Sequence, residues 1–455
     1  MPFMAVLGNP EIVETNSWLA LAYNRLGFSE PKSFLFFLGV VVFLTLVVSI
    51  TFEALTQWSL IRFTHMRNYS ISCRLFERYL NQPYAWFLNR HSADLGKSVL
   101  SEVQVVIHHV LLPVTQLLAY GSLALFMCIL LVLVDPFVAL IIALIIGGTY
   151  SLIYMIIRRY LTRIGKDRVL ANQERFQVAQ EALGGIKEVK VFGREKAFSQ
   201  KFTGPCFRFA KHQVNNNIVG QMPRYLLELV AFGGILFITL YLFRSHGHFS
   251  RVLPLLSLYA FAGYRLVPAL QKVYQHLTKL RFGLPALHIL YRDFMEMQDD
   301  QSTIEEADQP PLVPQASITL DKIQFTYPGA QSPVLKGISL DIPVNSAIGL
   351  VGATGSGKTT TVDIILGLLR PQSGQLLVDG NPIFNSPDQP AIRSWQRALG
   401  YVPQNIYLSD ETVAANIAFG IPSEEIDMEA VIRAATIAEL HNFVIRELPK
   451  GYETV

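Results

Sequence analysis

The chain has 455 residues, of which 51% are hydrophobic and only 16% are charged. Typical soluble domains carry about 25% charged residues, so this composition argues against an ordinary soluble protein and favours a membrane protein. The net charge of +3 is too small to indicate a nucleic acid as a partner. The three cysteines are scattered and match no disulfide or metal-site spacing, so we read them as buried hydrophobes or inert thiols.

The first two thirds of the sequence contain five stretches that are predicted to cross a bilayer. A spanning helix needs about 20 predominantly apolar residues. The second and third stretches meet at Asp135-Pro136, which predicts a hairpin with a very tight turn. The fourth contains Arg224 and Glu228 and the fifth contains Arg265, so these two are the weaker predictions. We place the spans at about 33–53, 110–134, 137–157, 219–243 and 252–272.

The distribution of basic residues predicts which connections face the cytoplasm. The connection at about 158–211 contains 13 Lys or Arg against 5 Asp or Glu, and the connection at about 62–109 is also basic. By the positive-inside rule, both connections lie in the cytoplasm. Both also look helical, so we expect the spanning helices to continue well beyond the bilayer. This alternation places the N-terminus outside, yet residues 1–32 contain no signal peptide. We therefore expect a sixth span upstream of residue 1.

The composition changes after residue 297. Residues 298–316 are acidic, polar and Pro-rich, which is typical of a linker. The sequences "SITLDKIQFTYP" and "VLKGISLDIP" follow, and their alternation of apolar and polar residues predicts short strands. We therefore expect an α-helical transmembrane domain at 1–297, a linker at 298–316 and a soluble α/β domain at 317–455.

A glycine-rich loop in the soluble domain carries the clearest chemical signal. The stretch "SAIGLVGATGSGKTTTVDIILGLL" reads as an apolar strand, a loop with the G-x-x-x-x-G-K-[ST] pattern and an amphipathic helix. Such a loop turns its backbone N–H groups toward phosphate oxygens, and the helix points its positive end at the same anion. Lys358 is expected to reach the β- and γ-phosphates, and Thr359 to offer its hydroxyl to Mg²⁺. The predicted phosphate contacts are Gly352, Ala353, Thr354, Gly355, Ser356, Gly357, Lys358, Thr359 and Thr360.

These motifs resemble the ATP-binding-cassette (ABC) transporter family, in the exporter-type arrangement that joins membrane and nucleotide-binding domains in one chain. Tyr327 in "FTYP" resembles the family's aromatic residue that stacks on adenine. Gln404 in "YVPQ" resembles its glutamine that contacts Mg²⁺ and the membrane domain. The segments "QPYAWFLNRHSADL" and "EALGGIKEVKVFGREKAF" resemble the two cytoplasmic loops whose short helices dock on the nucleotide-binding domains. The resemblance covers essentially the whole chain and implies ATP and Mg²⁺ as ligands.

A narrower resemblance is to bacterial flippases that move lipid-linked oligosaccharides in protein glycosylation; it is carried by "PYAWF", "MPRYLLE" and "YRLVPAL". Arg265 falls near the middle of its span, where an arginine is costly unless it faces a wet cavity or a partner. We expect Arg265, Arg224 and Glu228 to line the path of an anionic lipid headgroup. For Arg265, a structural ion pair and a misjudged span edge stay open as alternatives. Arg224 lies near enough to the cytoplasmic end to snorkel, and Glu228, one helical turn away, is placed to pair with it.

Three elements that complete the ATP site in this family are absent before Val455: an LSGGQ-type signature, a strand that ends in Asp-Glu, and a switch histidine. The resemblance therefore implies an incomplete nucleotide-binding domain. We expect the chain as given to contact phosphates but not to hydrolyse ATP. We also expect it to be either a fragment cut at both ends or the product of a wrongly delimited gene.

The resemblance implies that the intact protein is an ATP-driven transporter in the bacterial inner membrane, with its nucleotide-binding domain in the cytoplasm. We expect a second half transporter as its partner, in a homodimer or with a different half, and membrane lipids around it. The expected substrate is a lipid-linked oligosaccharide or another lipid. Two alternatives stay open: an exporter of peptides, drugs or lipid A-like lipids, and a regulatory membrane subunit that binds ATP without turning it over.

Overall fold

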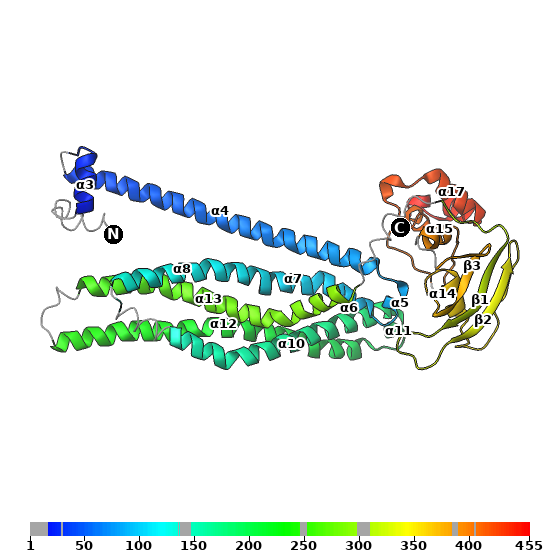
Figure 1. Ribbon diagram of the computed structural model, residues 1–455, viewed down its shortest axis with the longest axis horizontal. Coiled ribbons are helices and arrows are strands. Elements are labelled where there is room, and N and C mark those ends of the chain that lie inside the picture. Colours follow the sequence, from blue (N-terminus) through cyan, green and yellow to red (C-terminus); the bar gives the residue numbers. More distant parts are fainter. Residues whose placement is uncertain are drawn as a thin grey trace. The chain divides into compact units, whose positions relative to one another are not determined.

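The computed structural model describes residues 17–28, 31–134, 136, 147–245, 253–297, 310–384, 390–404 and 406–455. The chain divides into two compact units, which Figure 1 shows coloured along the sequence. The first unit, Met1–Glu305 with Tyr327–Gly329, contains the long helices. The second, Glu306–Thr326 with Ala330–Val455, contains the sheet.

Long helices dominate the first unit. α4 (Pro31–Leu80) has 50 residues, α12 (Glu195–Ser245) has 51 and α13 (Leu253–Glu296) has 44. Each is roughly twice as long as a bilayer requires. The expectation that the apolar stretches continue as helices into the basic segments beside them is therefore confirmed, while the cytoplasmic position of those segments stays a prediction. The other elements are α3 (Ser17–Arg25), α5 (Tyr84–Phe87), α6 (Ser92–Lys97), η1 (Ser98–Glu102), α7 (Val103–Val106), η2 (Ile107–Leu111), α8 (Leu112–Val134), α10 (Gly148–Gly184) and α11 (Ile186–Val191).

Two helical stretches of the described residues are long and apolar enough to cross a membrane, judged by length and composition: Lys32–Leu80 and Ser92–Ile129. They contain the first predicted span and most of the second. Residues 137–146 of the third predicted span, and Asp135 of the predicted turn, lie outside the described residues. The fourth and fifth predicted spans fall within α12 and α13, and the number of spans stays a prediction.

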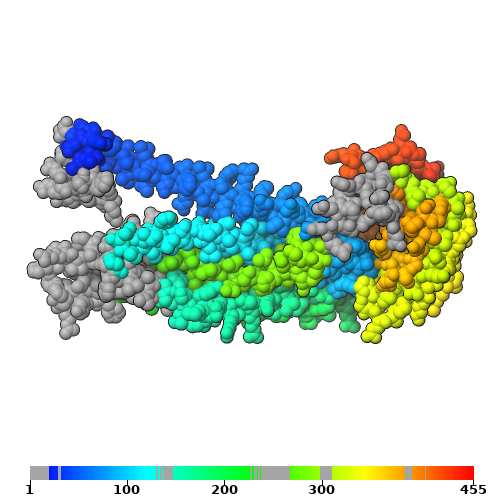
Figure 2. All heavy atoms as spheres, viewed as in Figure 1, coloured from blue at the N-terminus to red at the C-terminus, as the bar shows by residue number. Residues whose placement is uncertain are grey.

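The first half of α4 exposes apolar side chains. Phe36 is 76% exposed, Val48 67% and Phe52 71%. Figure 2 shows this helix along the visible face of the first unit. A contiguous apolar surface of this kind is rare on a soluble monomer, so it needs lipid or a protein partner to cover it. The exposure of α4 is therefore consistent with a membrane-spanning helix.

α8, α10, α12 and α13 pack side by side in a bundle (Figure 1). Two glycines permit close helix approaches. A Cβ on Gly165 of α10 would lie 2.5 Å from the carbonyl oxygen of Phe282 in α13. A Cβ on Gly283 would lie 2.7 Å from the Cβ of His109 in η2. These separations are far below van der Waals contact, so a larger residue at either glycine would push α13 away from its neighbours.

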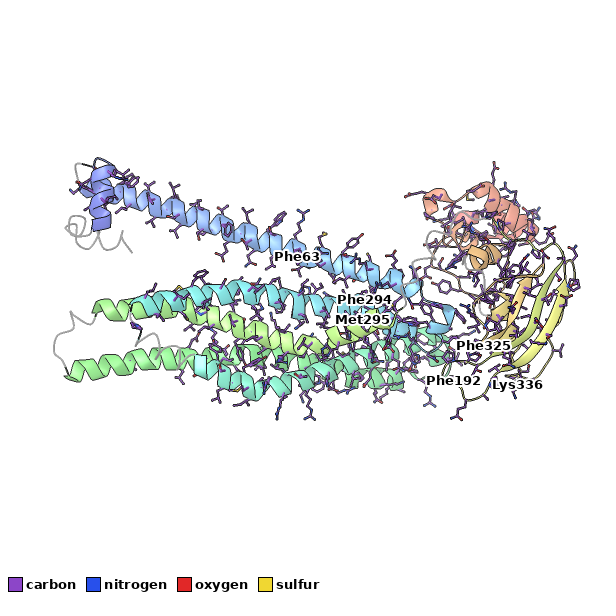
Figure 3. All side chains as sticks on the ribbon, in the orientation of Figure 1. Phe63, Phe192, Phe294, Met295, Phe325 and Lys336 are labelled. Carbon is purple, nitrogen blue, oxygen red and sulfur yellow. The ribbon has the colours of Figure 1, made fainter. Side chains whose placement is uncertain are left out.

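The core of this unit lies where the second half of α4 meets η1, α7, η2 and α13. Arg78 of α4 covers one end of it, with its guanidinium carbon 5.2 Å from the centre of the Phe294 ring, which Figure 3 labels. Cation–π contacts of this kind are favourable and also cover apolar surface. The buried apolar residues of this core are Leu75, Tyr79, Val103, Val106, Ile107, Val169, Ala286, Leu290 and Met297.

A buried ion pair links η1 to α10. Glu102 and Arg168 are both fully buried, and Nη2 of Arg168 lies 2.8 Å from Oε2 of Glu102. Nδ2 of Asn172 donates to the other carboxylate oxygen, also at 2.8 Å, and to Oγ of Ser101 at 3.0 Å. Two charges removed from water in this way depend on each other, because either alone would be a buried, uncompensated charge.

A second polar cluster anchors the segment that follows α5. Asp293 of α13 is buried; it accepts a hydrogen bond from the hydroxyl of Tyr79 at 3.0 Å, and Nη1 of Arg90 lies 3.5 Å from it. Arg90 also pairs with Glu296 at 3.0 Å and lies over the ring of Trp86, 4.1 Å from its centre. Burial, and then the charge of Asp293, raises the pKa of the Tyr79 hydroxyl, which keeps it a proton donor. The short helix α5 is thus fastened to both α4 and α13.

The second unit is built on a four-stranded antiparallel sheet in the order β2-β1-β3-β4. Both predicted strand sequences form neighbouring, hydrogen-bonded strands of this sheet, β1 (Ser317–Phe325) and β2 (Leu335–Pro343), so that prediction is confirmed. Trp395 is fully buried and donates its indole N–H to the carbonyl oxygen of Ile365 at 2.6 Å. The other elements are β3 (Ser373–Val378), β4 (Asn381–Pro382), α14 (Lys358–Ile365), α15 (Pro390–Arg397), α16 (Val413–Ile417), η7 (Ser423–Glu425), α17 (Met428–Ile437), α18 (His441–Glu447) and η8 (Gly451–Glu453).

The strand predicted immediately before the glycine-rich loop does not form. Residues 346–353 adopt no regular secondary structure, and Val351 is 98% exposed. A strand needs a hydrogen-bonding neighbour, and the described strands pair only with one another. The prediction of a strand at Ile348, Leu350 and Val351 was therefore wrong for this structure, because the run pairs with none of the described strands.

Asp379, in the turn after β3, holds the chain just ahead of β1. Its carboxylate accepts hydrogen bonds from the backbone N–H groups of Gln315, Ala316 and Ser317 at 2.7, 2.6 and 3.0 Å. These donors, with Gln315 contributing most, hold the pKa of the Asp379 carboxyl below its usual value. The end of the expected linker is thus bound to the sheet.

Asp379→Asn is expected to lower the free energy of unfolding near neutral pH but not in acid. A carboxyl with a depressed folded pKa adds stability above its unfolded pKa of about 3.9, and that stability is lost as pH falls through the folded value. The difference in unfolding free energy from the wild type should therefore be present at about pH 7 and shrink below about pH 4. Urea denaturation across this range measures it. Asp410→Asn, at an exposed position, is the matched control, and a difference that stays constant with pH would contradict the assignment.

Candidate nucleotide-binding site

The glycine-rich loop has the backbone that its sequence predicts. Gly355 and Gly357 have φ angles of 82° and 91°, in the left-handed region that glycine adopts without steric strain. Gly357 is the N-cap of α14, so the helix begins at Lys358. The N–H groups of the first helical turn have no partner within the helix, and the helix dipole adds positive potential at the same end. The loop and helix start together offer a binding site for phosphate.

Lys358 lies across the mouth of the loop. Its ammonium donates to the carbonyl oxygens of Gly352 and Ala353, both at 2.8 Å, and lies 3.5 Å from Oγ of Ser356. Bonds to neutral carbonyls are weaker than charge-assisted bonds to phosphate oxygens. A bound phosphate would therefore compete successfully for this ammonium, and the side chain has only to turn outward to meet it.

The two threonines after Lys358 differ in exposure. Thr359 is exposed, as a hydroxyl that meets a metal ion must be, whereas Thr360 is buried with 4% exposure. The described residues contain no group of three or more His, Cys, Asp or Glu that could hold a metal ion. Mg²⁺ usually binds with nucleotides through the phosphates and one or two protein oxygens. Thr359 and Gln404 are the predicted protein ligands, and the contact of Thr360 with ATP also stays a prediction.

The other residues predicted to contact ATP or Mg²⁺ are exposed or half-buried. Thr354 and Ser356 are exposed in the loop, and Gln404 is exposed in an irregular segment after α15. Tyr327 follows the end of β1, half-buried, and belongs by its contacts to the first unit. The stacking of Tyr327 on adenine and the role of Gln404 toward the membrane region therefore stay predictions from the resemblance.

Gly357→Ala is expected to damage the loop more than Gly355→Ala. Both substitutions carry the left-handed strain of a side chain, about 1–2 kcal/mol, which corresponds to roughly a tenfold loss of ATP affinity. A Cβ at Gly357 would also lie 2.6 Å from Cδ2 of Leu335, which is buried in β2, while a Cβ at Gly355 meets nothing within 4 Å. Titration with a fluorescent ATP analogue measures both affinities. Equal losses of ATP affinity in the two variants would show that the close contact between Leu335 and a side chain at position 357 does not matter.

The residues predicted to line the transport path are only partly described. Nε of Arg224 donates to Oε1 of Glu228 at 2.6 Å, so the pairing predicted from their spacing is confirmed. The side chain of Arg265 in α13 lies outside the described part of the structure. Because Glu228 already compensates the charge of Arg224, this arginine is a weaker candidate for attracting an anion than the sequence suggested.

Two features of the first unit were missed from the sequence. One is the buried pair of Glu102 and Arg168. The other is a basic pocket between α10, α12 and α13. From the sequence, its basic residues predict only the side of the membrane on which the connection lies. A signal was present for the pocket: Arg159, Arg163 and Lys166 are spaced by four and three residues, which places them on one face of a helix.

Comparisons with known proteins agree with both units. Residues 15–247 match the family model described as the ABC transporter transmembrane region, and residues 335–453 match the model described as ABC transporter. The ATP-dependent lipid A-core flippase of Cupriavidus pinatubonensis is 27% identical over 391 residues, which cover 84% of this chain and 63% of the flippase. The mouse protein "ATP-binding cassette sub-family B member 10, mitochondrial" (Mus musculus) is 27% identical over 399 residues, 84% of this chain and 53% of that protein. The chain thus spans less than two thirds of the length of these relatives.

A solved structure resembles the whole chain. It is a bacterial Atm1-family ABC exporter with ATP bound, with a TM-score of 0.72 and 19% sequence identity; the match covers 98% of this chain and 76% of that one. At this identity the likeness concerns the fold alone. Since the membrane-region model by itself matches residues 15–247 and the second model matches the phosphate loop and its surroundings, the chain belongs to the ABC transporter family, as an exporter-type half transporter that joins membrane and ATP-binding regions.

Proposed function

We propose that this chain is one half of an ATP-driven transporter that moves a lipid, such as a lipid-linked oligosaccharide, across the bacterial inner membrane. The observation that carries the proposal is the phosphate loop, with Lys358 at the start of α14, in the same chain as a membrane region of long helices. The relatives named lipid A-core flippases support a lipid as the transported class. The partner is a second half transporter, in the simplest case another copy of this chain.

The nucleotide step rests on the loop described above. Its backbone N–H groups and Lys358 neutralise the phosphate charges, and Tyr327 stacks on adenine. Thr359 and Gln404 would hold Mg²⁺, which would supply positive charge beside the phosphates. In phosphoryl transfer the protein mainly positions and neutralises, and this loop is built for both tasks.

A movement of the nucleotide-binding domain on ATP binding would reach the membrane region through α5 and α11. Both are short helices at the ends of long ones: α5 follows α4, and α11 lies between α10 and α12. Arg90, just after α5, is held by Asp293 and Glu296 near the end of α13. A displacement of α5 would therefore be transmitted to α13, because an anchored polar cluster resists separation more than a flexible tether would.

Arg265→Ala tests the predicted transport path. If Arg265 lines it, the variant should bind ATP as the wild type does and transport the lipid more slowly. Titration with an ATP analogue and a transport assay on the same preparation separate the two properties. If the folded variant still uses ATP and transports the lipid as fast as the wild type, Arg265 does not line the transport path.

ATP turnover tests the proposed function, measured on the intact half transporter that the resemblance implies, reconstituted in lipid nanodiscs, because the chain as given is not expected to hydrolyse ATP. Separate samples contain a lipid-linked oligosaccharide, lipid A, or a hydrophobic peptide. The proposal predicts turnover that rises with the lipid-linked oligosaccharide or lipid A and not with the peptide. Stimulation by the peptide alone would instead indicate a peptide exporter. Tight ATP binding without turnover in every sample would overturn the proposal in favour of a regulatory subunit.

A further inference from the structure

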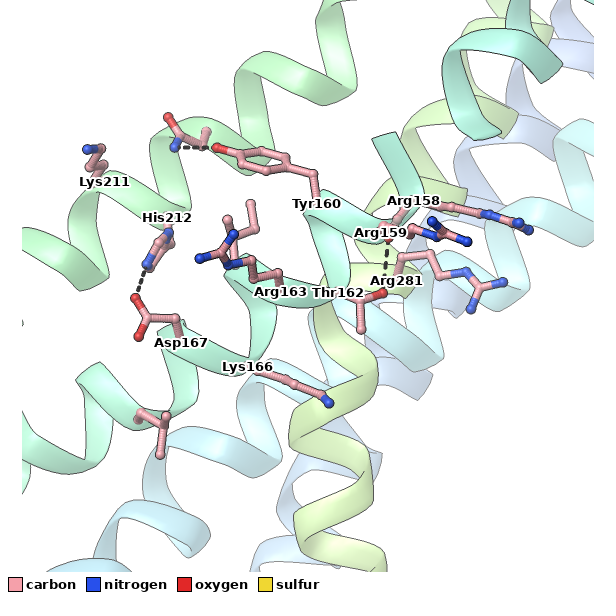
Figure 4. Close-up of a pocket in the computed structure, with 13 residues that line it drawn as sticks. Arg158, Arg159, Tyr160, Thr162, Arg163, Lys166, Asp167, Lys211, His212 and Arg281 are labelled. Carbon is pink, nitrogen blue, oxygen red and sulfur yellow. Dashed lines mark hydrogen bonds and ion pairs between the residues drawn. The ribbon is translucent and has the colours of Figure 1, made fainter. Parts of the chain in front are cut away.

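A basic pocket opens between α10, α12 and α13 of the first unit. Its volume is about 1000 Å³, large enough for a lipid headgroup, and Figure 4 shows the side chains that line it. Tyr160, Thr162 and Asn215 contribute neutral polar groups to the same wall. The basic residues of the lining come from all three helices: Arg158, Arg159, Arg163, Lys166, Lys211 and Arg281.

The charge in this pocket is almost uncompensated. The one acidic residue of the lining, Asp167, is already occupied, because Nε2 of His212 lies 2.5 Å from its Oδ2 and Nη1 of Arg208 lies 3.4 Å from its Oδ1. Nε of Arg281 donates to the hydroxyl of Tyr154 at 2.8 Å, which fixes the guanidinium without neutralising it. The other five basic side chains form no ion pair with any residue that the structure describes. Six like charges in one pocket repel each other, and a multiply charged anion would relieve that repulsion.

The pocket lies at the level expected for the inner leaflet. The predicted span at 137–157 ends just before Arg158, and the predicted span at 219–243 begins shortly after Asn215. The predicted span at 252–272 ends shortly before Arg281. All three helices therefore enter the bilayer next to the pocket, where the phosphates of inner-leaflet lipids lie.

The chemistry of the lining suits phosphate oxygens. Guanidinium groups present several N–H donors in a planar fork that matches phosphate geometry, and lysines add mobile point charges. Tyr160 accepts a hydrogen bond from Nδ2 of Asn215 at 2.8 Å, so its own hydroxyl proton can point into the pocket (Figure 4). The positive-inside rule explains basic residues at this level but not their convergence from three helices on one cavity.

We propose that this pocket binds the phosphate or pyrophosphate group of a phosphorylated lipid in the inner leaflet and holds it at the entrance to the transport path. The proposal rests on the proposed function, since it names the headgroup chemistry by which that transporter selects its lipid. The recognised group carries two or more negative charges, so a neutral or singly charged lipid binds weakly.

Direct binding to the purified chain in neutral detergent micelles tests the pocket. Every sample carries Lys358→Ala, so that binding of the probes by the phosphate loop is weakened equally in all of them. The probes are geranyl pyrophosphate, which has a lipid tail and a pyrophosphate, inorganic pyrophosphate, which has no tail, and geraniol, which has no charge. The pocket variant is Arg159→Gln/Arg163→Gln/Lys211→Gln. The matched control, Arg74→Gln/Arg194→Gln/Lys196→Gln, removes the same charge from exposed positions outside the pocket.

Geranyl pyrophosphate should bind the unmodified pocket more tightly than either other probe. The pocket variant should lose at least about tenfold in affinity, and the matched control should lose less than about threefold. Arg159→Lys/Arg163→Lys/Lys211→Arg, which keeps the charge, should retain most of the binding and shows that a loss in the glutamine variant is not misfolding.

Three results of these binding measurements would overturn the inference. Equal losses in the pocket variant and the matched control would show general charge attraction. Equal affinity for inorganic and geranyl pyrophosphate would show that the pocket binds a free anion and does not recognise the lipid tail. Equal affinity for geraniol and geranyl pyrophosphate would show that it does not recognise the anionic group. None of these measurements needs ATP turnover. A reconstituted transporter that fails to use ATP would therefore contradict the proposed function but not this inference. A pocket variant that transports lipid as fast as the wild type would contradict this inference but not the proposed function.

Discussion

Replacing Lys358 by alanine is expected to lower the affinity for ATP by about 10- to 100-fold, the loss typical of a hydrogen-bonded charge that contacts phosphate. In the structure its ammonium is held by neutral oxygens of the loop itself, 2.8 Å from the carbonyl oxygens of Gly352 and Ala353 and 3.5 Å from Oγ of Ser356. Without this side chain the helix start and the backbone N–H groups would have to neutralise the phosphates alone. Titration of the purified chain with a fluorescent ATP analogue and Mg²⁺ measures the change.

Lys336→Ala is the matched control for this measurement. Lys336 is an exposed lysine on β2, labelled in Figure 3, and its replacement removes the same charge from the same unit. The control variant should bind ATP as the wild type does. If Lys358→Ala binds ATP as tightly as Lys336→Ala, the phosphate loop is not the site, and the proposed function loses its main support.

Glu102→Ala is expected to destabilise the first unit by about 3–5 kcal/mol, because Arg168 would stay buried without a counter-charge. Arg168 has no exposed surface, and its Nη1 and Nε have no other hydrogen-bond partner among the described residues. Asn172 would also lose the acceptor that it contacts at 2.8 Å. The expected fall in the thermal unfolding midpoint is about 6–20 °C for a unit of this size, measured by circular dichroism in detergent.

Two further variants identify the cause of that fall. Glu181→Ala removes a carboxylate from the exposed face of the same helix bundle, where it pairs with Lys201 at 2.6 Å, and should change stability by at most about 1 kcal/mol. Glu102→Leu/Arg168→Leu removes both buried charges and should recover much of the loss, since a buried pair is often replaceable by apolar residues. If Glu102→Ala is no worse than Glu181→Ala, the buried pair contributes little to the fold.

The phosphate loop could be predicted from sequence because its signal is local. The glycines, Lys358 and the helix that follows lie within a few residues of one another, and the required φ angles are ones that only glycine adopts easily. The long helices were predictable for the same reason, since helical periodicity is a property of neighbouring residues.

Contacts between distant segments could not be predicted in this way. Glu102 and Arg168 are 66 residues apart, and their meeting depends on how η1 packs against α10. A partial signal exists, because Arg168 and Asn172 share a helix face with the buried Leu161 and Ile164. A polar residue on an apolar face indicates a buried partner but does not identify it.

The strand expected before the phosphate loop fails for a related reason. Ile348, Leu350 and Val351 have the composition of a strand, and that property is local. Pairing is not local, and none of the described strands pairs with this run. Secondary structure that needs a distant partner is therefore the part of this fold that composition alone predicts least well.

Movement of a fluorescent lipid-linked oligosaccharide in proteoliposomes is the most direct test of the central claim. The vesicles carry the intact half transporter that the resemblance implies, with Mg²⁺ and ATP supplied on the side that bears the phosphate loop. A membrane-impermeant quencher reports which leaflet holds the label. The account predicts that the label changes leaflet only when ATP is present, with Lys336→Ala active and Lys358→Ala inactive. Label that crosses at the same rate without ATP, or with Lys358→Ala, would contradict it.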